Sequence, residues 1–262
     1  MIQTVHAYQF HRFMGTGRTS PALCGCEQAE GQSAGDFVVK LRGGMERGVT
    51  GLASELIASR IAAYFGIPVP APVLVSIDAA FAELVAASQP SKAQRMRGSV
   101  GLNFGSRQLS DVMTWPVDKA IPEAMGATAV CIFAFDALIQ NPDRKFSPNP
   151  NLFSRGDQIF VYDHELAFSF IENILPSETP WRLDRCNYLT DHVFFKRLKR
   201  KEVDLTLFTT LLAALPEAAL PAIMADVPPE WNNSSLPKIE DHLCAVAAQS
   251  QQFAEELRRK LA

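Results

Sequence analysis

Four oxygen-bearing side chains within one short stretch of the sequence could bind a metal ion and move a proton. They are Asp143, Asn149, Asn151 and Asp163. Carboxylate and amide oxygens are the hard ligands that Mg²⁺ takes, and a carboxylate can also accept the proton of a hydroxyl group. Asn, Asp and Pro are also common in turns, so each residue taken alone is equally explained by turn chemistry.

The order of these residues is typical of phosphoryl transfer. Asp143 follows a long apolar segment, Asn151 enters a short apolar strand, and Asp163 ends the apolar run IFVYD. In protein kinases, one Asp orients the acceptor hydroxyl or accepts its proton, while an Asn and a second Asp hold Mg²⁺ against the phosphates. A preference for turns can explain each of these residues alone, but it explains less well why all of them occur in this order.

A lysine and a glutamate earlier in the chain could complete such a site. Strand alternation places Lys40, at the end of DFVVK, on the same face as Val38, and a buried lysine needs an anionic partner. Glu55 lies in a later segment with helical spacing. A strand lysine and a helix glutamate form the ion pair that holds nucleotide phosphates in protein kinases. The alternative is a solvated strand lysine and a surface glutamate.

The stretch GTGRTSP near the N-terminus could bind phosphate through its backbone. It carries two glycines and three side-chain donors: Gly15, Gly17, Arg18, Thr19 and Ser20. Glycine lets backbone N–H groups approach phosphate oxygens closely. No Gly-Lys-Ser/Thr follows, so the stretch is not a Walker A loop, and a flexible turn between strands is the alternative.

The elements that must position these residues begin with a small β-rich part. Strands are expected at 35–41 and 70–78, with a helix over 51–65 between them. Thr50 is a candidate N-cap for that helix, and Gly66 is a candidate C-terminal stop. This helix carries the glutamate of the expected ion pair.

The second half of the chain is predicted to be mainly helical. The segment 122–140 is apolar nearly all round, which indicates a buried helix, and its Asp136 is expected to satisfy donors near the following loop. NLF and QIFVYD are typical of a short hairpin with SRGDQ as its turn. Further helical patterns occur at 191–199, 203–214 and 236–261.

Composition is that of an ordinary folded protein. The chain has 262 residues, 47% hydrophobic and 20% charged, with a net charge of -3. This balance gives no reason to expect direct nucleic-acid or membrane binding.

Five scattered cysteines fit neither a disulfide framework nor a zinc site. The N-terminus has no signal-peptide pattern and no apolar run is long enough for a membrane span, so we expect a cytoplasmic protein.

These motifs together resemble the HipA-like kinases, in particular the compact group whose kinase domain forms most of the chain. The matching stretches are FMGTGRTSP, FVVK, SELIASRIAAYFGIPVP, FDALIQNPDR, NPNLF, VYDHELAF and PPEW. QNPDR, NPNLF and YDHELAF are the most specific of them. The resemblance implies an α+β, two-lobed protein-kinase-like fold that binds ATP with Mg²⁺. We expect the β-rich N-lobe at residues 1–105 and the mainly helical C-lobe at 106–262.

The resemblance also implies a role for each candidate residue. Lys40 would contact the α- and β-phosphates, with Glu55 as its ion-pair partner. Asp143 would be the catalytic Asp, and Arg144 resembles the basic residue that follows it. Asp163 would be a metal ligand. The loop residues named above would cover the nucleotide phosphates.

One spacing departs from the usual kinase pattern. About four residues usually separate the catalytic Asp from the metal Asn, whereas Asn149 and Asn151 lie further along this chain. We favour Asn151 as the metal ligand because it directly precedes the apolar Leu152, and Asn149 is its rival. In some HipA-like kinases a loop Ser is autophosphorylated, which makes Thr19 and Ser20 candidates here.

The leading functional hypothesis is an ATP- and Mg²⁺-dependent kinase that phosphorylates Ser or Thr on a protein and acts as a toxin with an antitoxin partner. Two alternatives stay open. One is a kinase-fold nucleotide-binding module with little catalysis, and the other is a kinase of small molecules, because fold does not fix the substrate.

Overall fold

The computed structural model describes residues 1–15, 19–118, 120–173, 175 and 177–262. The predicted loop residues Gly17 and Arg18 therefore lie outside the described residues. The chain forms two compact units. The first comprises Met1–Leu56, Pro70–Ser110 and Ala225–Asn233, and the second comprises Ile57–Val69, Asp111–Met224 and Ser234–Ala262.

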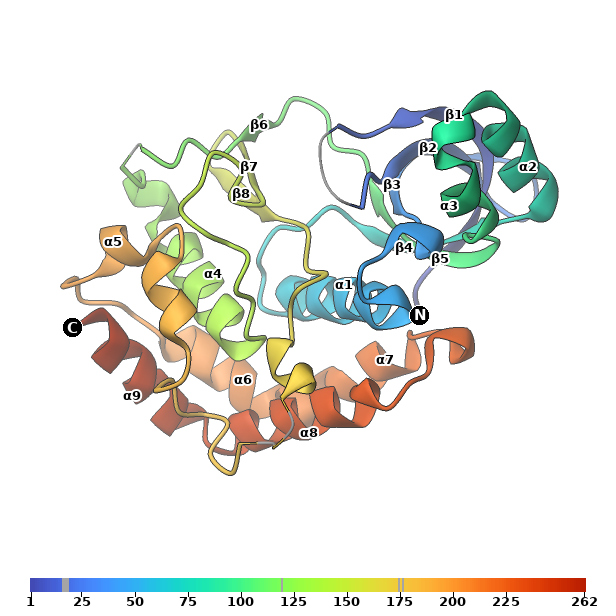
Figure 1. The fold of residues 1–262 in the computed structure, drawn as a ribbon. Helices are drawn as coiled ribbons and strands as arrows, with labels where there is room; N and C mark the ends of the chain where they lie inside the picture. The colour runs from blue at the N-terminus through green and yellow to red at the C-terminus, as the bar shows by residue number, and fades with distance from the viewer. Residues whose placement is uncertain (16–18, 119, 174, 176) are drawn as a thin grey trace. The chain divides into compact units, whose positions relative to one another are not determined.

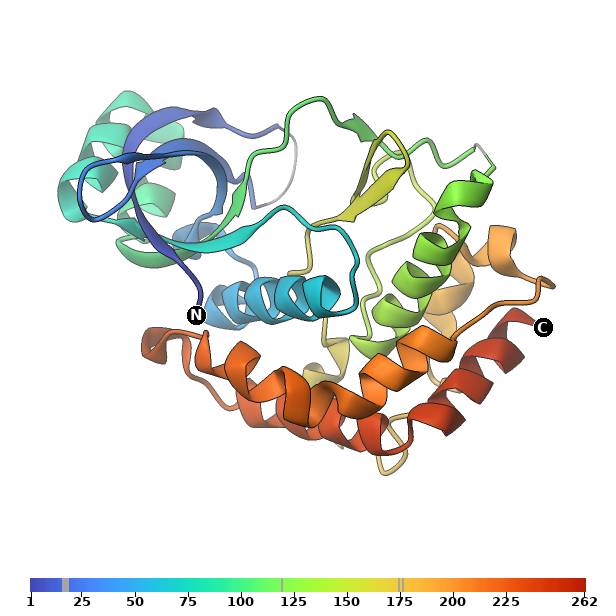
Figure 2. The ribbon, with the colours of Figure 1, turned by 180° about the vertical axis from the view of Figure 1, so that it is seen from behind.

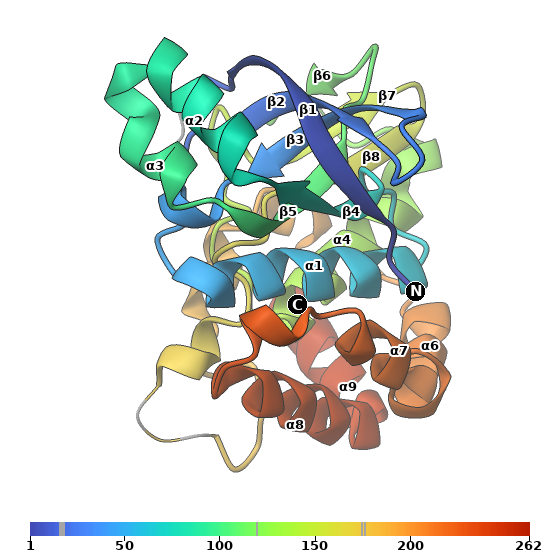
Figure 3. The same ribbon diagram turned by 90° about the vertical axis from the view of Figure 1, so that its right-hand side faces the viewer.

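The first unit is built on a closed β-barrel (Figure 3). Its strands are β1 (Thr4–Phe13), β2 (Ala22–Glu27), β3 (Ser33–Lys40), β4 (Pro72–Ile77) and β5 (Gly101–Arg107), in the order β1-β2-β3-β5-β4. β1 pairs in parallel with β4, which closes the barrel, and the other neighbours are antiparallel. Closure removes exposed strand edges.

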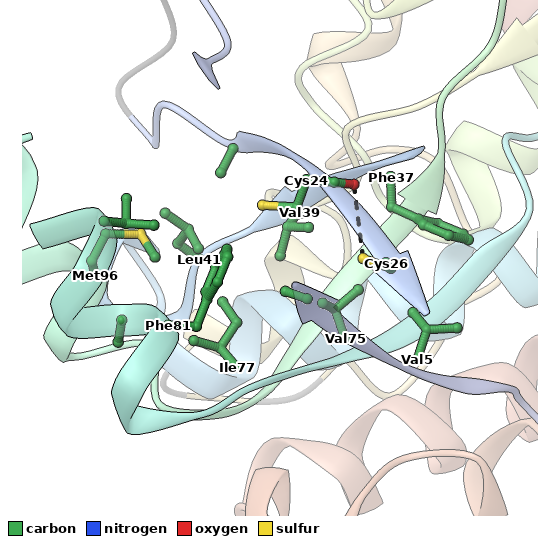
Figure 4. Close-up of a cluster of buried hydrophobic side chains, with 14 of the residues drawn as sticks. Val5, Cys24, Cys26, Phe37, Val39, Leu41, Val75, Ile77, Phe81 and Met96 are labelled. Carbon is green, nitrogen blue, oxygen red and sulfur yellow. Dashed lines mark hydrogen bonds between the residues drawn. The ribbon is translucent and has the colours of Figure 1, made fainter. Parts of the chain in front are cut away.

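Apolar side chains fill the barrel and continue under the neighbouring helices (Figure 4). The labelled members of this core are Val5, Cys24, Cys26, Phe37, Val39, Leu41, Val75, Ile77, Phe81 and Met96. The two cysteines lie on the inward face of β2 as small apolar residues, and Cys26 Sγ lies 3.8 Å from the carbonyl oxygen of Cys24. This core fixes the strand β3 that carries the predicted lysine.

Two helices are inserted between β4 and β5 and flank the barrel (Figure 3). α2 (Ala79–Ser88) begins after Asp78, whose side chain accepts a hydrogen bond of 2.7 Å from the Phe81 N–H and so caps the helix. A 3₁₀ turn at Pro90–Lys92 leads into the short α3 (Ala93–Arg97). α3 was not among the elements expected from the sequence.

The helix that carries the predicted glutamate is α1 (Gly48–Tyr64). Its C-terminus matches the expectation: Gly66 has a φ of 72°, and the Ile67 N–H reaches the Ala62 carbonyl at 2.9 Å, which is a Schellman motif. Its N-terminus does not. The helix begins two residues before Thr50, so Thr50 lies inside the first turn and is not the N-cap.

A late segment of the chain belongs to the first unit. Residues 225–233 include a 3₁₀ turn at Pro229–Trp231. Trp231 is fully buried and donates from Nε1 to the Leu102 carbonyl at 3.2 Å, while Glu230 accepts from the Leu102 N–H at 2.8 Å. The PPEW motif therefore fixes one end of β5.

The second unit holds the predicted buried helix and hairpin (Figure 1). α4 (Gly126–Leu138) follows a 3₁₀ turn at Glu123–Met125 and is buried along most of its length. The strands β6 (Met113–Thr114), β7 (Leu152–Arg155) and β8 (Gln158–Val161) form an antiparallel sheet in that order. β7 and β8 are the predicted hairpin, and they place both of its ends beside the loop that follows α4.

Helices complete the second unit. They are α5 (Phe195–Leu198), α6 (Thr206–Ala218), α7 (Leu220–Ala225), α8 (Ser235–Ala248) and α9 (Ser250–Leu261), with 3₁₀ turns at Ser169–Glu172 and Asn187–Asp191. α6 packs against α8 and α9 (Figure 2). The pattern at 236–261 predicted one helical stretch, which the structure divides at Gln249.

The fold class is as predicted. The chain has an α+β fold with a β-rich N-terminal part and a mainly helical C-terminal part. Within the described ranges, no helix is both long and apolar enough to cross a bilayer.

Candidate active site

The lysine of β3 and the glutamate of α1 form an ion pair inside the first unit. Lys40 Nζ lies 3.0 Å from Glu55 Oε1, and their side chains are only 9% and 2% exposed. Strand alternation places Lys40 on the face of β3 that it shares with Val38, as expected from the sequence, and opposite the barrel-core residue Val39. The second turn of α1 presents the glutamate. Removing either partner would leave the other charge buried without this counter-ion, which is strongly destabilising.

The described ends of the glycine-rich loop are also in the first unit. The Met14 N–H donates to the Pro21 carbonyl at 2.6 Å and closes the base of the loop. Gly15 is exposed, whereas Ser20 is buried and has a φ of 39°, which is rare for a residue with a side chain. Thr19 lies between them in the described part of the loop.

Asp143 lies in the second unit, in the loop that leaves the C-terminus of α4. Its N–H donates to Asn141 Oδ1 at 3.1 Å, so the preceding asparagine fixes the turn. Partial burial, followed by the negative charge of Asp163, raises the pKa of Asp143 above its ordinary value. Lys145 and Asn151 act in the opposite direction. A carboxylate with a raised pKa is a better proton acceptor.

Asn151 lies against this carboxylate. Its Nδ2 donates to Asp143 Oδ2 at 3.0 Å, and the residue is 5% exposed with a φ of 57°. Asn149 is placed differently: its Oδ1 accepts from the Tyr162 hydroxyl at 3.0 Å on the exposed side of the hairpin. The geometry thus groups Asn151 with Asp143, and the assignment of the metal ligand stays a prediction.

Asp163 follows β8 and has a φ of 59°, in the left-handed region. Its negative charge contributes to the raised pKa of Asp143. The next residues, His164 and Glu165, are buried. Strained backbone of this kind persists where surrounding contacts hold it, and it is frequent at functional sites.

Arg144 holds these pieces in place. Its side chain is excluded from solvent, and NH1 donates to the carbonyls of Asn151 at 2.5 Å and Tyr162 at 3.3 Å. The guanidinium of the residue that follows Asp143 therefore links the candidate metal ligand Asn151 to Tyr162, the residue before Asp163. The resemblance implied only that a basic residue follows the candidate catalytic Asp.

Asp136 of α4 orients that guanidinium. Its Oδ2 accepts from Arg144 Nε at 2.6 Å, and its Oδ1 accepts from Asn141 Nδ2 at 2.9 Å. The expectation that this aspartate satisfies donors near the loop is confirmed. Burial raises the pKa of Asp136, but the charge of Arg144 and the hydrogen bond from His192 outweigh it and hold the pKa at about 2.

His192 completes the cluster. Its Nε2 lies 3.0 Å from Asp136 Oδ2, and its Nδ1 accepts from the Phe194 N–H at 3.1 Å, so Nε2 carries the proton of the neutral ring. Burial lowers the pKa of His192, and Asp136 partly offsets that effect. The position of His192 in the sequence has no spacing that links it to a site.

Sequence reasoning also missed Lys145. Its Nζ lies 4.0 Å from Asp143 Oδ1 on a side chain that is 55% exposed. A lysine beside the candidate catalytic carboxylate can attract a phosphate group. The only cue in the sequence was its position two residues after the aspartate.

The donor set of the second unit suits magnesium. Among the described residues, no cluster of three or more His, Cys, Asp or Glu side chains is placed to hold a metal. The candidate site instead combines two carboxylates with an asparagine amide, all oxygen donors. Oxygen-only sets with few protein ligands are the ones that Mg²⁺ takes when substrate phosphates supply the rest.

Comparison with known proteins agrees with this chemistry. A search of curated proteins finds no match. The model of a family described as HipA-like kinase matches residues 8–260, which is nearly the whole chain. The family implies phosphotransferase activity and the use of ATP. The chain belongs to the HipA-like kinase family.

Proposed function

We propose that the protein transfers the γ-phosphate of ATP, with Mg²⁺, to a Ser or Thr hydroxyl of a protein. The observation that carries the proposal is the contact of Asp143 with Asn151 at 3.0 Å, beside the carboxylate of Asp163. A proton acceptor next to an oxygen donor set is what phosphoryl transfer to a hydroxyl requires.

In this proposal Asp143 is the proton acceptor. As the acceptor hydroxyl attacks the γ-phosphorus, its proton passes to the Asp143 carboxylate, the bond to the bridging oxygen breaks, and ADP leaves. The raised pKa of Asp143 favours this transfer. The buried Arg144 keeps Asp143 and the hairpin in register, so that little reorganisation is needed during the reaction.

The remaining roles concern the phosphates. Lys40 would contact the α- and β-phosphates, and its ion pair with Glu55 would hold the ammonium group in place. Asn151 and Asp163 would hold Mg²⁺, which when bound neutralises phosphate charge. Gly15, Thr19 and Ser20 would approach the nucleotide from the glycine-rich loop.

The decisive experiment compares the unmodified chain with Asp143→Asn. Purified protein is incubated with Mg²⁺ and γ-labelled ATP, and both nucleotide binding and label transfer are measured. We expect the variant to bind nucleotide and to lose transfer by about 10²- to 10⁴-fold. Nucleotide binding without transfer in both proteins would instead favour a kinase-fold binding module. Equal transfer by both would refute the role of Asp143.

The class of acceptor is a separate question. We propose a protein acceptor and a toxin-like action relieved by an antitoxin. Phosphoproteomics after expression should then reveal a Ser or Thr phosphosite that is absent with Asp143→Asn, together with a growth defect that the substitution relieves. Turnover of ATP without such a site would favour a small-molecule acceptor.

A further inference from the structure

An arginine of the inserted helix pair contacts the end of the glycine-rich loop. Arg95 of α3 donates from NH1 to the carbonyls of Thr19 at 2.5 Å and Ser20 at 3.4 Å. Lys92 Nζ lies 3.4 Å from Ser20 Oγ. Two cationic side chains of one short segment thus hold the two residues that close the loop before β2.

The same arginine contacts the turn that follows Lys40. A Cβ at position 44 would lie 2.7 Å from Arg95 Nε, and a Cβ at position 43 would overlap the carbonyl oxygen of Arg95. Only glycines leave room for this approach. Ser99 adds a second link, since its Oγ donates to the Arg95 carbonyl at 2.7 Å and accepts from the Gly43 N–H at 3.1 Å.

These contacts have a conformational consequence at Ser20. Its φ of 39° is unfavourable for a residue with a side chain, and such backbone persists only where neighbours hold it. The bonds from Arg95 to the Ser20 carbonyl and from Lys92 to the Ser20 hydroxyl help to hold it. The guanidinium therefore stabilises the loop end in a conformation that the local sequence does not favour.

We infer that Arg95 is a positioning residue for nucleotide phosphates. It acts by fixing the end of the glycine-rich loop at Thr19 and Ser20 against the turn after Lys40. The inference rests on the proposed function, since it assumes that the loop and Lys40 bind the phosphates of ATP. It adds a residue from the α2–α3 insertion, which carries none of the predicted site residues.

The first test is Arg95→Ala with Arg97→Ala as matched control. Arg97 lies on the same short helix, but its guanidinium pairs with Glu83 on the exposed surface, at 2.8 Å from Nε to Oε1. Hydrogen bonds from a charged donor contribute more to binding and stability than neutral ones. We therefore expect KM for ATP to rise about tenfold in Arg95→Ala, with kcat within about threefold. Arg97→Ala should leave both constants unchanged.

The second test approaches the same contact from its other side. Gly44→Ala requires no left-handed backbone, but its methyl group displaces the Arg95 side chain. KM for ATP should therefore rise in Gly44→Ala. In the Arg95→Ala background the space is open, so adding Gly44→Ala should change KM no further. Such non-additivity is the signature of two residues acting through one contact.

The outcomes separate the inference from the proposed function. Equal KM values for the unmodified chain and Arg95→Ala, or full additivity with Gly44→Ala, would overturn the inference alone. Failure of the unmodified chain to bind ATP would overturn both. If Arg95→Ala does not fold, Arg95→Met takes its place, because it keeps the apolar stem of the side chain and removes only the guanidinium.

Discussion

Arg144 Nε lies 2.6 Å from Asp136 Oδ2, and both side chains are completely excluded from solvent. This pair links the buried helix α4 to the loop that carries the candidate catalytic aspartate. The guanidinium also bonds to the backbone on each side of the β7–β8 hairpin. The geometry of the candidate metal site thus depends on a charge cluster that never reaches the solvent.

Asp136→Asn should destabilise the protein strongly. The substitution keeps the size of the side chain but leaves the Arg144 charge buried without its counter-ion, which typically costs about 3–5 kcal/mol. Chemical denaturation measures the change in the free energy of unfolding. Glu83→Gln is the matched control, because it breaks the solvent-exposed pair with Arg97 and should shift the midpoint little. Equal shifts for the two variants would contradict the prediction.

The two asparagines of the hairpin should differ in function. Asn151→Ala removes the amide that contacts Asp143, so we expect loss of most phosphotransfer and a weaker response to Mg²⁺. Asn149→Ala removes only an exposed bond to the Tyr162 hydroxyl and should retain activity. Initial rates across a Mg²⁺ titration check this. A larger defect in Asn149→Ala would reverse the assignment.

Local patterns predicted much of what the candidate site needs. Period-two alternation placed Lys40 on the same face of β3 as Val38, helical spacing placed Glu55 on a helix, and Gly66 ended that helix in a left-handed conformation. Each of these inferences depends on residues close together in the chain. The prediction of Thr50 as N-cap was wrong, which shows that local patterns do not fix the first residue of a helix. The helix begins at Gly48, which has a φ of 54°, two residues before Thr50.

Contacts between distant residues could not be predicted. Arg95 meets Thr19 across 76 residues, and His192 meets Asp136 across 56. Neither pair has a spacing that marks it, since such contacts are set by how the elements pack. The sequence favoured Asn151 over Asn149 as metal ligand from its position before Leu152, but its contact with Asp143 follows only from the path of the hairpin.

The cysteines should be unreactive in the folded protein. Burial raises the pKa of Cys24 and of Cys26 to about 12, and burial raises that of Cys131 to about 12 as well. Because the thiolate is the reactive form, alkylation at neutral pH should be slow in the native state and complete after denaturation. Mass spectrometry with iodoacetamide gives the rates. Rapid native labelling of Cys24 or Cys26 would show that the barrel opens.

A buried histidine should make stability depend on pH. His242 of α8 donates from Nε2 to the Leu138 carbonyl at 2.9 Å and stacks on Phe170 with ring centroids 4.0 Å apart. Burial lowers its pKa to about 4 from 6.5, against the effect of the bond to Leu138. Between these values the unfolded chain binds the proton and the folded chain does not. Stability therefore falls as pH drops from 6.5 to 4, by roughly 1.4 kcal/mol per pH unit and on the order of 3 kcal/mol in all.

His242→Gln should flatten this dependence, because the amide keeps a donor for the Leu138 carbonyl but does not titrate. Free energies of unfolding at several pH values between 7 and 4 give the slope for each protein. His6→Gln, at an exposed position on β1, is the control for the loss of a histidine in general. If His242→Gln and the unmodified chain lose stability in parallel on acidification, the loss arises elsewhere, and the neutral His242 ring is not what limits stability in acid.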